Sequence, residues 1–323
     1  MEYVLIAVQL AFGVLGLHYG ANWLVSGSSK LALTFGIKPL IIGLTVVAMG
    51  TSAPELTVSL GGAFQGKADL AVGNVVGSNI ANIGLILGLS ALIRPMKIQI
   101  EPLKRDLPFM LFAALLLAVL PFIGGPVETE NGVAFMMGRW KGGVLLGAMA
   151  LFMWLTFRNA RGGGEGELTE KPKGRGLFVL LTLVGLGVLL IGGKLFVDGA
   201  VSSAKSLGIP ELVIGLTVVA VGTSLPELAT SLIATIKGES DISLGNVVGS
   251  NIFNVCMVLG LVAVIQPLAI DVRVMQLDMI VMLFLSLWVT SMAWRGKDLS
   301  RLEGISLLGA YVLYVVNLFF GWV

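Results

Sequence analysis

Residues Gly36 to Ile98 read GIKPLIIGLTVVAMGTSAPELTVSLGGAFQGKADLAVGNVVGSNIANIGLILGLSALIRPMKI, and the pattern returns from Gly208 to Ile270 as GIPELVIGLTVVAVGTSLPELATSLIATIKGESDISLGNVVGSNIFNVCMVLGLVAVIQPLAI. The copies align without a gap, so that Glu55 matches Glu227 at an offset of 172 residues (227 − 55). Each copy carries this glutamate in the middle of an apolar segment. Because a carboxylate inside a bilayer is costly, its presence twice in matching surroundings predicts a cation-binding site.

The composition is that of an integral membrane protein. Hydrophobic residues make up 56% of the chain, charged residues only 12%, and the mean hydropathy is +0.95. The apolar runs have the length that spans a bilayer as a helix, and no barrel-like alternation is present. We therefore predict an all-α membrane protein with ten transmembrane helices, at roughly 3–29, 39–64, 70–93, 107–123, 141–157, 177–204, 211–236, 242–265, 275–294 and 302–322.

The positive residues predict the topology. When the loops are assigned alternately to two sides, fifteen Lys and Arg residues fall on one side and five on the other. The positive-inside rule then places both termini outside the cell membrane and the loop 158–176 in the cytoplasm. This glycine-rich loop links a first five-helix repeat (1–157) to a second (177–323). Since five is odd, the second repeat enters the membrane from the opposite side, and such inverted repeats are typical of alternating-access transporters.

A proline precedes each of the two glutamates, in GTSAPE (50–55) and GTSLPE (222–227). Pro54 cannot donate a hydrogen bond to the carbonyl of Gly50, and the same holds for its counterpart Pro226, so the helix opens and main-chain carbonyls are freed. Each motif therefore offers a carboxylate, two hydroxyls and main-chain oxygens within about one turn. An all-oxygen set suits hard cations such as Ca²⁺ or Na⁺.

A second motif follows in each copy, GNVVGSNIAN (73–82) and GNVVGSNIFN (245–254). Its serine and last asparagine are four residues apart and share a helical face, so we expect Asn82 and Asn254 to line the site. Interhelical hydrogen bonding is the competing explanation for these two residues. The remaining asparagines are expected to satisfy main-chain groups or bridge helices, and the glycines to permit close helix packing; they are Asn74, Asn79, Asn246, Asn251, Gly73, Gly77, Gly245 and Gly249.

The paired GTSxPEL and GNVVGSNIxN segments resemble the two alpha repeats (36–98 and 208–270) of the cation/calcium exchanger (CaCA) superfamily, and most closely its short prokaryotic sodium/calcium antiporters. The resemblance covers essentially the whole chain. It implies that Glu55 and Glu227 bridge Ca²⁺, and that the first and sixth spans slide to alternate access. Some relatives carry an aspartate where this chain has Asn254, so its site has one acid fewer.

The resemblance also implies a role for other residues of the two motifs. The carbonyls of Thr51 and Thr223 would complete the calcium site, and Asn82 and Asn254 would line its centre. The sodium sites would be built by Ser52, Ser224, Ser78, Ser250, Ala48 and Ala220.

These observations predict a secondary antiporter, not an enzyme, that exchanges Ca²⁺ for Na⁺ without a cofactor. No nucleotide-binding motif is present, so an ion gradient must drive it. Its partners would be the two ions and the lipid bilayer, with no nucleic acid and no obligate protein partner, and the chain would be a monomer. A proton-coupled divalent cation exchanger of the same fold is the alternative, since glutamates also carry protons. An intramembrane hydrolase using the two acids and a channel are further alternatives.

Overall fold

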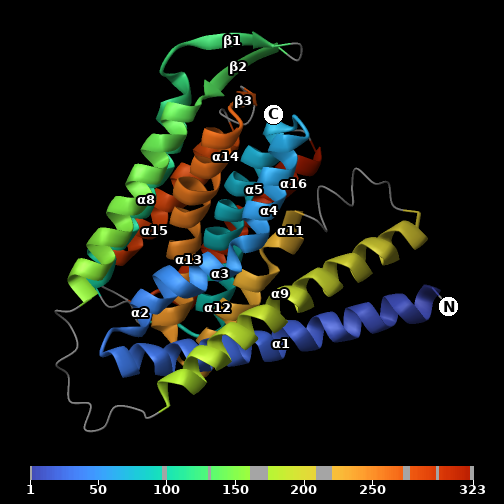
Figure 1. The fold of residues 1–323 in the computed structure, drawn as a ribbon, viewed down its shortest axis with the longest axis vertical. Coiled ribbons are helices and arrows are strands. Elements are labelled where there is room, and N and C mark those ends of the chain that lie inside the picture. Colours follow the sequence, from blue (N-terminus) through green and yellow to red (C-terminus); the bar gives the residue numbers. More distant parts are fainter. Residues whose placement is uncertain are drawn as a thin grey trace. The chain divides into compact units, whose positions relative to one another are not determined.

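The computed structural model describes residues 2–96, 100–129, 132–160, 174–208, 220–271, 277–295 and 298–320. Most of these residues are helical (Figure 1). The chain forms two compact units, and each takes one segment from either half of the sequence. The first unit combines Met1–Pro54 with Asn159–Asn246, and the second combines Glu55–Arg158 with Val247–Val323.

Two long helices dominate the first unit, α1 (Glu2–Phe35) and α9 (Arg175–Ser206), which lie side by side (Figure 1). Glycines allow their backbones to meet: a methyl group at Gly20 would lie 2.4 Å from the main-chain nitrogen of Leu189. Gly13 faces Phe196 while Gly27 faces Thr182, so the two helices run antiparallel. Small residues at such a seam are the usual device for close packing of membrane helices.

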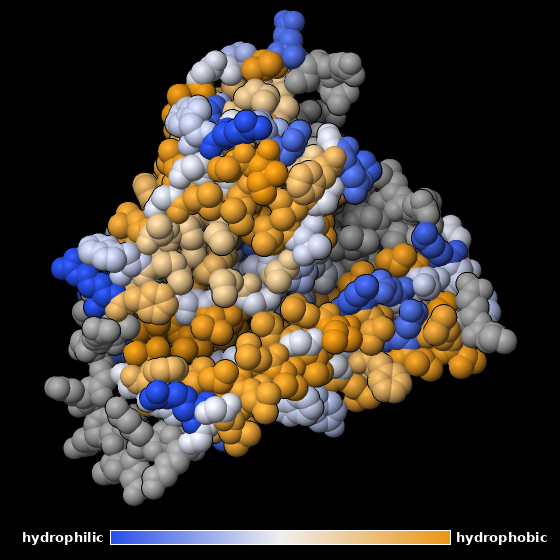
Figure 2. All heavy atoms as spheres, in the orientation of Figure 1, coloured by the Kyte–Doolittle hydropathy of each residue, from blue (hydrophilic) through white to orange (hydrophobic). Residues whose placement is uncertain are grey.

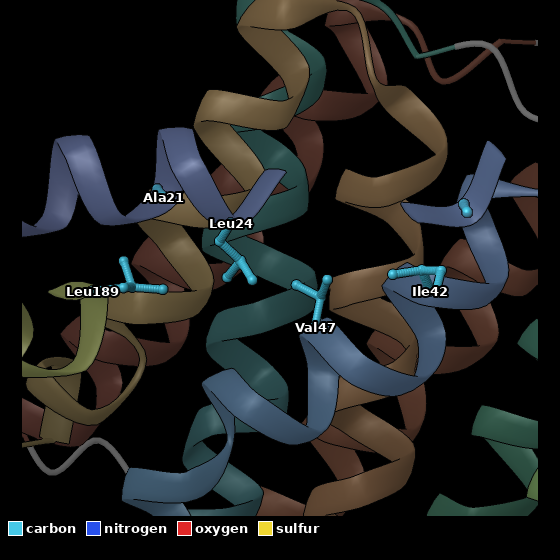
Figure 3. Packing of buried hydrophobic residues seen from close by; sticks show 6 residues of the cluster. Ala21, Leu24, Ile42, Val47 and Leu189 are labelled. Atoms are coloured by element: carbon cyan, nitrogen blue, oxygen red, sulfur yellow. The ribbon is translucent and has the colours of Figure 1, made fainter. Parts of the chain in front are cut away.

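The apolar core of the first unit includes buried side chains of this helix pair. The others come from α2 (Pro39–Ile42) and η1 (Gly43–Val47), as Figure 3 shows. The opposite faces of α1 and α9 expose large apolar side chains, among them Phe12 and Leu183. Figure 2 shows hydrophobic residues over this surface. An apolar exterior of this extent is suited to lipid and not to water.

The helices that carry the glutamates are interrupted at matching points. Helix α3 (Ala48–Thr51) ends at Ser52, whose ψ angle is 6°, and α12 (Leu225–Lys237) begins after Ser224, whose ψ is 4°. Both breaks come two residues before the proline, as the loss of the proline donor requires. In the first copy the helical segments Pro39–Thr51 and Ala53–Phe64 (α4) are bent by 42° at this break. Helix α11 (Ala220–Thr223) precedes the break in the second copy.

The second unit contains the remaining helices. They are α5 (Ala68–Ala81), η2 (Asn82–Leu87), α6 (Gly88–Ile93), α7 (Ile100–Val119), η3 (Leu120–Phe122), α8 (Arg139–Ala160), η5 (Phe253–Leu259), α14 (Gly260–Ile265), α15 (Met279–Trp294) and α16 (Arg301–Phe320), together with the end of α13 (Ser240–Ile252). The segments η2 and η5 are π-helical and begin at or beside Asn82 and Asn254. π-Helical turns are common at functional sites. Helix α16 packs on η2 and α6, where Gly84 accommodates Tyr311.

The prediction of a purely helical chain is wrong in one place. A three-stranded antiparallel sheet forms from β1 (Pro126–Thr129), β2 (Gly132–Met137) and β3 (Leu268–Asp271). Its strands are four to six residues long, too short to give a periodic signal. The β2–β3 pairing also joins segments that are far apart in the sequence.

The described residues contain seven helices that are long and apolar enough to cross a membrane, or eight when the bent pair counts as one span. They correspond to predicted spans one to six, eight and ten. The ninth span is present as the shorter apolar helix Met279–Met292. The seventh, 211–236, falls partly on residues 211–219, which lie outside the described residues. The chain is thus a helical membrane protein, and its ten-span topology stays a prediction.

Candidate cation site

Glu227 lies in the first unit with no exposed surface. The Ser52 hydroxyl donates a hydrogen bond to its Oε1 at 3.1 Å. Asn246 holds the same residue by its main chain, because Nδ2 donates to the Glu227 carbonyl at 3.3 Å and to Ser231 Oγ at 3.0 Å. The Thr51 hydroxyl lies 3.1 Å from Asn246 Oδ1. Glu227 of α12 is therefore held by Ser52, directly after α3, and by Asn246 of α13.

Glu55 lies in the second unit and is equally buried. The Ser78 hydroxyl donates to its Oε1 at 3.4 Å. Asn74 Nδ2 donates to the Glu55 carbonyl at 3.2 Å and to Ser59 Oγ at 3.0 Å. These last two bonds repeat those of Asn246 residue for residue. The prediction that Asn74 and Asn246 satisfy main-chain groups is confirmed.

The other residues predicted for the ion site are also buried in their own units. In the first unit, Ala48, Thr51, Ser52, Thr223 and Ser224 are all buried at or beside the helix breaks. Residue Ala220 begins α11, and its side chain lies outside the described part of the chain. In the second unit, Ser78, Ser250, Asn82 and Asn254 are buried. The donors are carboxylate, hydroxyl, amide and main-chain oxygens, which are the ligands that hard cations prefer.

Four asparagines form a network in the second unit. Asn82 Nδ2 donates to Asn251 Oδ1 at 3.0 Å, and Asn254 Nδ2 donates to Asn79 Oδ1 at 3.2 Å. Each bond is the counterpart of the other at the repeat offset. Asn79 Nδ2 also donates to the main-chain carbonyl of Asn251 at 3.2 Å. Asn79 and Asn251 thus bridge helices as predicted, and the amide nitrogens of Asn82 and Asn254 do so as well.

The amide oxygens of Asn82 and Asn254 are different. Both are buried, and neither has a hydrogen-bond partner among the described residues. The hydroxyl of Ser250, on the same helical face as Asn254, is in the same condition. Buried polar atoms are rarely left unpaired, so these oxygens are candidates for binding water or a cation. Interhelical bonding therefore engages the nitrogens of Asn82 and Asn254, while the lining of an ion site by their oxygens stays a prediction.

Sequence reasoning missed four polar or sulfur-bearing residues of this arrangement. Ser59 and Ser231 accept the asparagine bonds described above. The thioethers of Met110 and Met282 accept from Asn251 and Asn79. The four residues make two pairs of identical counterparts at the repeat offset of 172 residues. This identity is the signal that could have found them, even for the methionines, which lie outside the two motifs.

The comparisons with known proteins agree with one another. The family model described as "Sodium/calcium exchanger protein" matches residues 5–158 and 177–320. The inner membrane protein YrbG of Escherichia coli (strain K12) is 39% identical over 326 residues, covering 98% of this chain and 97% of the relative. The sodium/calcium exchanger MaX1 of Methanosarcina acetivorans is 34% identical over 341 residues, covering 96% and 97%.

A solved structure agrees over the whole chain. The sodium-calcium exchanger NCX_Mj, in a structure soaked with 10 mM Na⁺ and zero Ca²⁺, superimposes with a TM-score of 0.86. Its sequence is 32% identical, and the match covers 98% of this chain and 100% of that one. The family model leaves unmatched only the central residues 159–176 and a few residues at each end of the chain.

Proposed function

The chain belongs to the sodium/calcium exchanger family, and we propose that it is a secondary antiporter that exchanges Ca²⁺ for Na⁺ across the membrane by alternating access. One observation carries the proposal. Each copy of the repeat buries a glutamate completely and holds its main-chain carbonyl in the same way, with a bond from an asparagine of the second motif. A serine hydroxyl also donates to each Oε1, from Ser52 to Glu227 and from Ser78 to Glu55, although these two serines are not counterparts in the repeat. A protein gains nothing in stability from two such acids, so their purpose is to bind cations.

Glu55 and Glu227 bind the ions together in this proposal. One Ca²⁺ neutralises both carboxylates, and several Na⁺ ions replace it at overlapping oxygens. An empty site would carry uncompensated negative charge through a medium of low dielectric constant, which opposes the return of the unloaded carrier. Exchange is therefore obligatory. The remaining ligands are the carbonyls of Thr51 and Thr223 and the polar or small residues Ser52, Ser224, Ser78, Ser250, Ala48, Ala220, Asn82 and Asn254.

Two inverted repeats supply the two access states. The antiparallel packing of α1 on α9 supports this arrangement, because the first helices of inverted repeats must run in opposite directions. The crossed asparagine bonds support it within the second unit, because each bond maps onto the other at the repeat offset. We place both termini outside and the loop 158–176 in the cytoplasm, where the excess of Lys and Arg favours it.

Reconstitution into liposomes tests the proposal. Sodium-loaded vesicles are diluted into sodium-free buffer, and uptake of radiolabelled Ca²⁺ is followed. We expect uptake by the natural chain to need the outward sodium gradient. Glu55→Gln and Glu227→Gln should each weaken Ca²⁺ binding by on the order of 100-fold or more, since each leaves a desolvated dication with one charge uncompensated. Glu128→Gln is the matched control, because Glu128 is exposed in β1.

Three results would contradict the proposal. Uptake that follows a pH gradient and ignores Na⁺ would show proton coupling. Calcium flux without any counter-ion would show a channel. Normal sodium-driven uptake by either Gln variant would place the ion site elsewhere.

A further inference from the structure

We infer that Asn79 and Asn251 are positioning residues that turn the side-chain amides of Asn254 and Asn82 so that each presents its oxygen, and not its NH₂ group, to the transported ions. The inference rests on the proposed function. The orientation of these amides decides whether the site can bind a cation, because a reversed amide would present two N–H donors to the cation in place of an oxygen acceptor.

The orientation of Asn79 follows from what surrounds its nitrogen. Nδ2 faces the main-chain carbonyl of Asn251 at 3.2 Å and the thioether of Met282 at 3.7 Å. A carbonyl and a thioether only accept hydrogen bonds, so the NH₂ group of Asn79 must lie on that side. Oδ1 then faces the opposite way and accepts the bond from Asn254 Nδ2. The nitrogen of Asn254 is thereby engaged, and its oxygen is the end that remains.

Asn251 fixes Asn82 in the same sequence of steps. Its Nδ2 donates to the thioether of Met110 at 3.5 Å, and its Oδ1 accepts from Asn82 Nδ2. Reversing Asn251 would place two acceptors together at Met110 and two donors together at Asn82. A buried group left without its partner costs more than an ordinary hydrogen bond contributes, so the reversed arrangement is disfavoured. Both chains of contacts end in a buried amide oxygen with no partner in the described part of the chain.

The two asparagine pairs, Asn79–Asn254 and Asn251–Asn82, are each called a lock here because the first residue fixes the orientation of the second. The two locks differ in strength. Asn79 is held by a carbonyl as well as a thioether. For Asn251, the contact that sets its orientation within the described residues is the weaker thioether of Met110 alone. The inference therefore predicts that the Asn251–Asn82 lock depends on its methionine more than the Asn79–Asn254 lock does.

A double-mutant cycle tests the inference, with the Ca²⁺ concentration for half-maximal sodium-driven uptake as the readout. We expect Asn82→Ala and Asn251→Ala each to raise this concentration by on the order of tenfold. The double variant N82A/N251A should also show only about tenfold, because Asn251 acts through Asn82. The crossed double variant N82A/N79A should show about 100-fold, because Asn79 acts through Asn254.

Methionine variants give a test that leaves the asparagines in place. Met110→Leu and Met282→Leu nearly conserve volume and remove the thioether acceptor. We expect Met110→Leu to weaken apparent Ca²⁺ affinity by about threefold and Met282→Leu to weaken it less. The control is Met292→Leu, which changes another buried methionine of α15 and should leave affinity unchanged.

The outcomes separate this inference from the proposed function. If the natural chain shows no sodium-driven uptake, the proposed function fails. If uptake is normal but the losses of N82A and N251A multiply, or N82A alone has no effect, the positioning role is wrong. It is also wrong if Met110→Leu behaves as Met292→Leu does.

Discussion

Gly245 lies in the second copy of GNVVGSN, and its substitution by alanine should destabilise the protein. A methyl group at Gly245 would lie 2.8 Å from the carbonyl oxygen of Leu40 and 3.0 Å from the main-chain nitrogen of Leu44. These short distances confirm the prediction of close helix packing for Gly245. Its counterpart Gly73 would meet the counterparts of Leu40 and Leu44 at positions 212 and 216, which lie outside the described residues, so close packing at Gly73 stays a prediction.

The expected effect is a loss of stability. The atoms that crowd Gly245 belong to the backbone, so Gly245→Ala must displace α2 or η1, and overpacking of this kind costs about 1–3 kcal/mol. Gly147→Ala is the matched control, because Gly147 is exposed in α8 and alanine gains up to about 1 kcal/mol over glycine in a helix. Thermal unfolding of the purified protein in detergent measures the difference. Equal melting temperatures for the two variants would refute the reasoning.

Two further substitutions test local contacts. Ser52→Ala removes the hydroxyl that donates to Glu227 Oε1. Because hydrogen bonds to charged groups contribute about 1.5–3 kcal/mol, the apparent ion affinity in the uptake assay should fall about 10- to 100-fold. Unchanged affinity would show that this bond is not part of the ion-loaded site. Lys141→Met removes an ammonium group that donates to the carbonyls of Pro121, Ile123 and Met136. The free energy of unfolding should therefore fall by about 2–3 kcal/mol. Transport per folded molecule should be retained. Loss of transport without loss of stability would contradict a purely structural role for Lys141.

The sequence predicted the helices and the polar groups around each glutamate well, because both depend on local chemistry. Long apolar runs leave few alternatives to a helix in a membrane, and proline before glutamate predicts the break seen at Ser52 and Ser224. The pairing of each glutamate with an asparagine of the second motif required the structure. Spacing along a helix predicts a shared face, but it does not predict which residues on another helix meet that face.

The small sheet could not be predicted from the sequence. Strands β1 to β3 are short, and their pairing depends on where α8 and α14 bring the chain. The contact of Gly245 with Leu40 and Leu44 also required the structure, because a glycine in a helix does not by itself indicate which segment packs against it.

The two acids are held by their asparagines in the same way. The bonds from Asn74 and Asn246 to the glutamate carbonyls are the same in both copies, and so are the bonds to Ser59 and Ser231. The proposed carrier needs such bonds, because its ligands must stay in place while the route to them changes sides. Contacts that the repeat duplicates can persist through both access states. The glutamate and asparagine substitutions therefore test ion binding, whereas the glycine substitution tests helix packing.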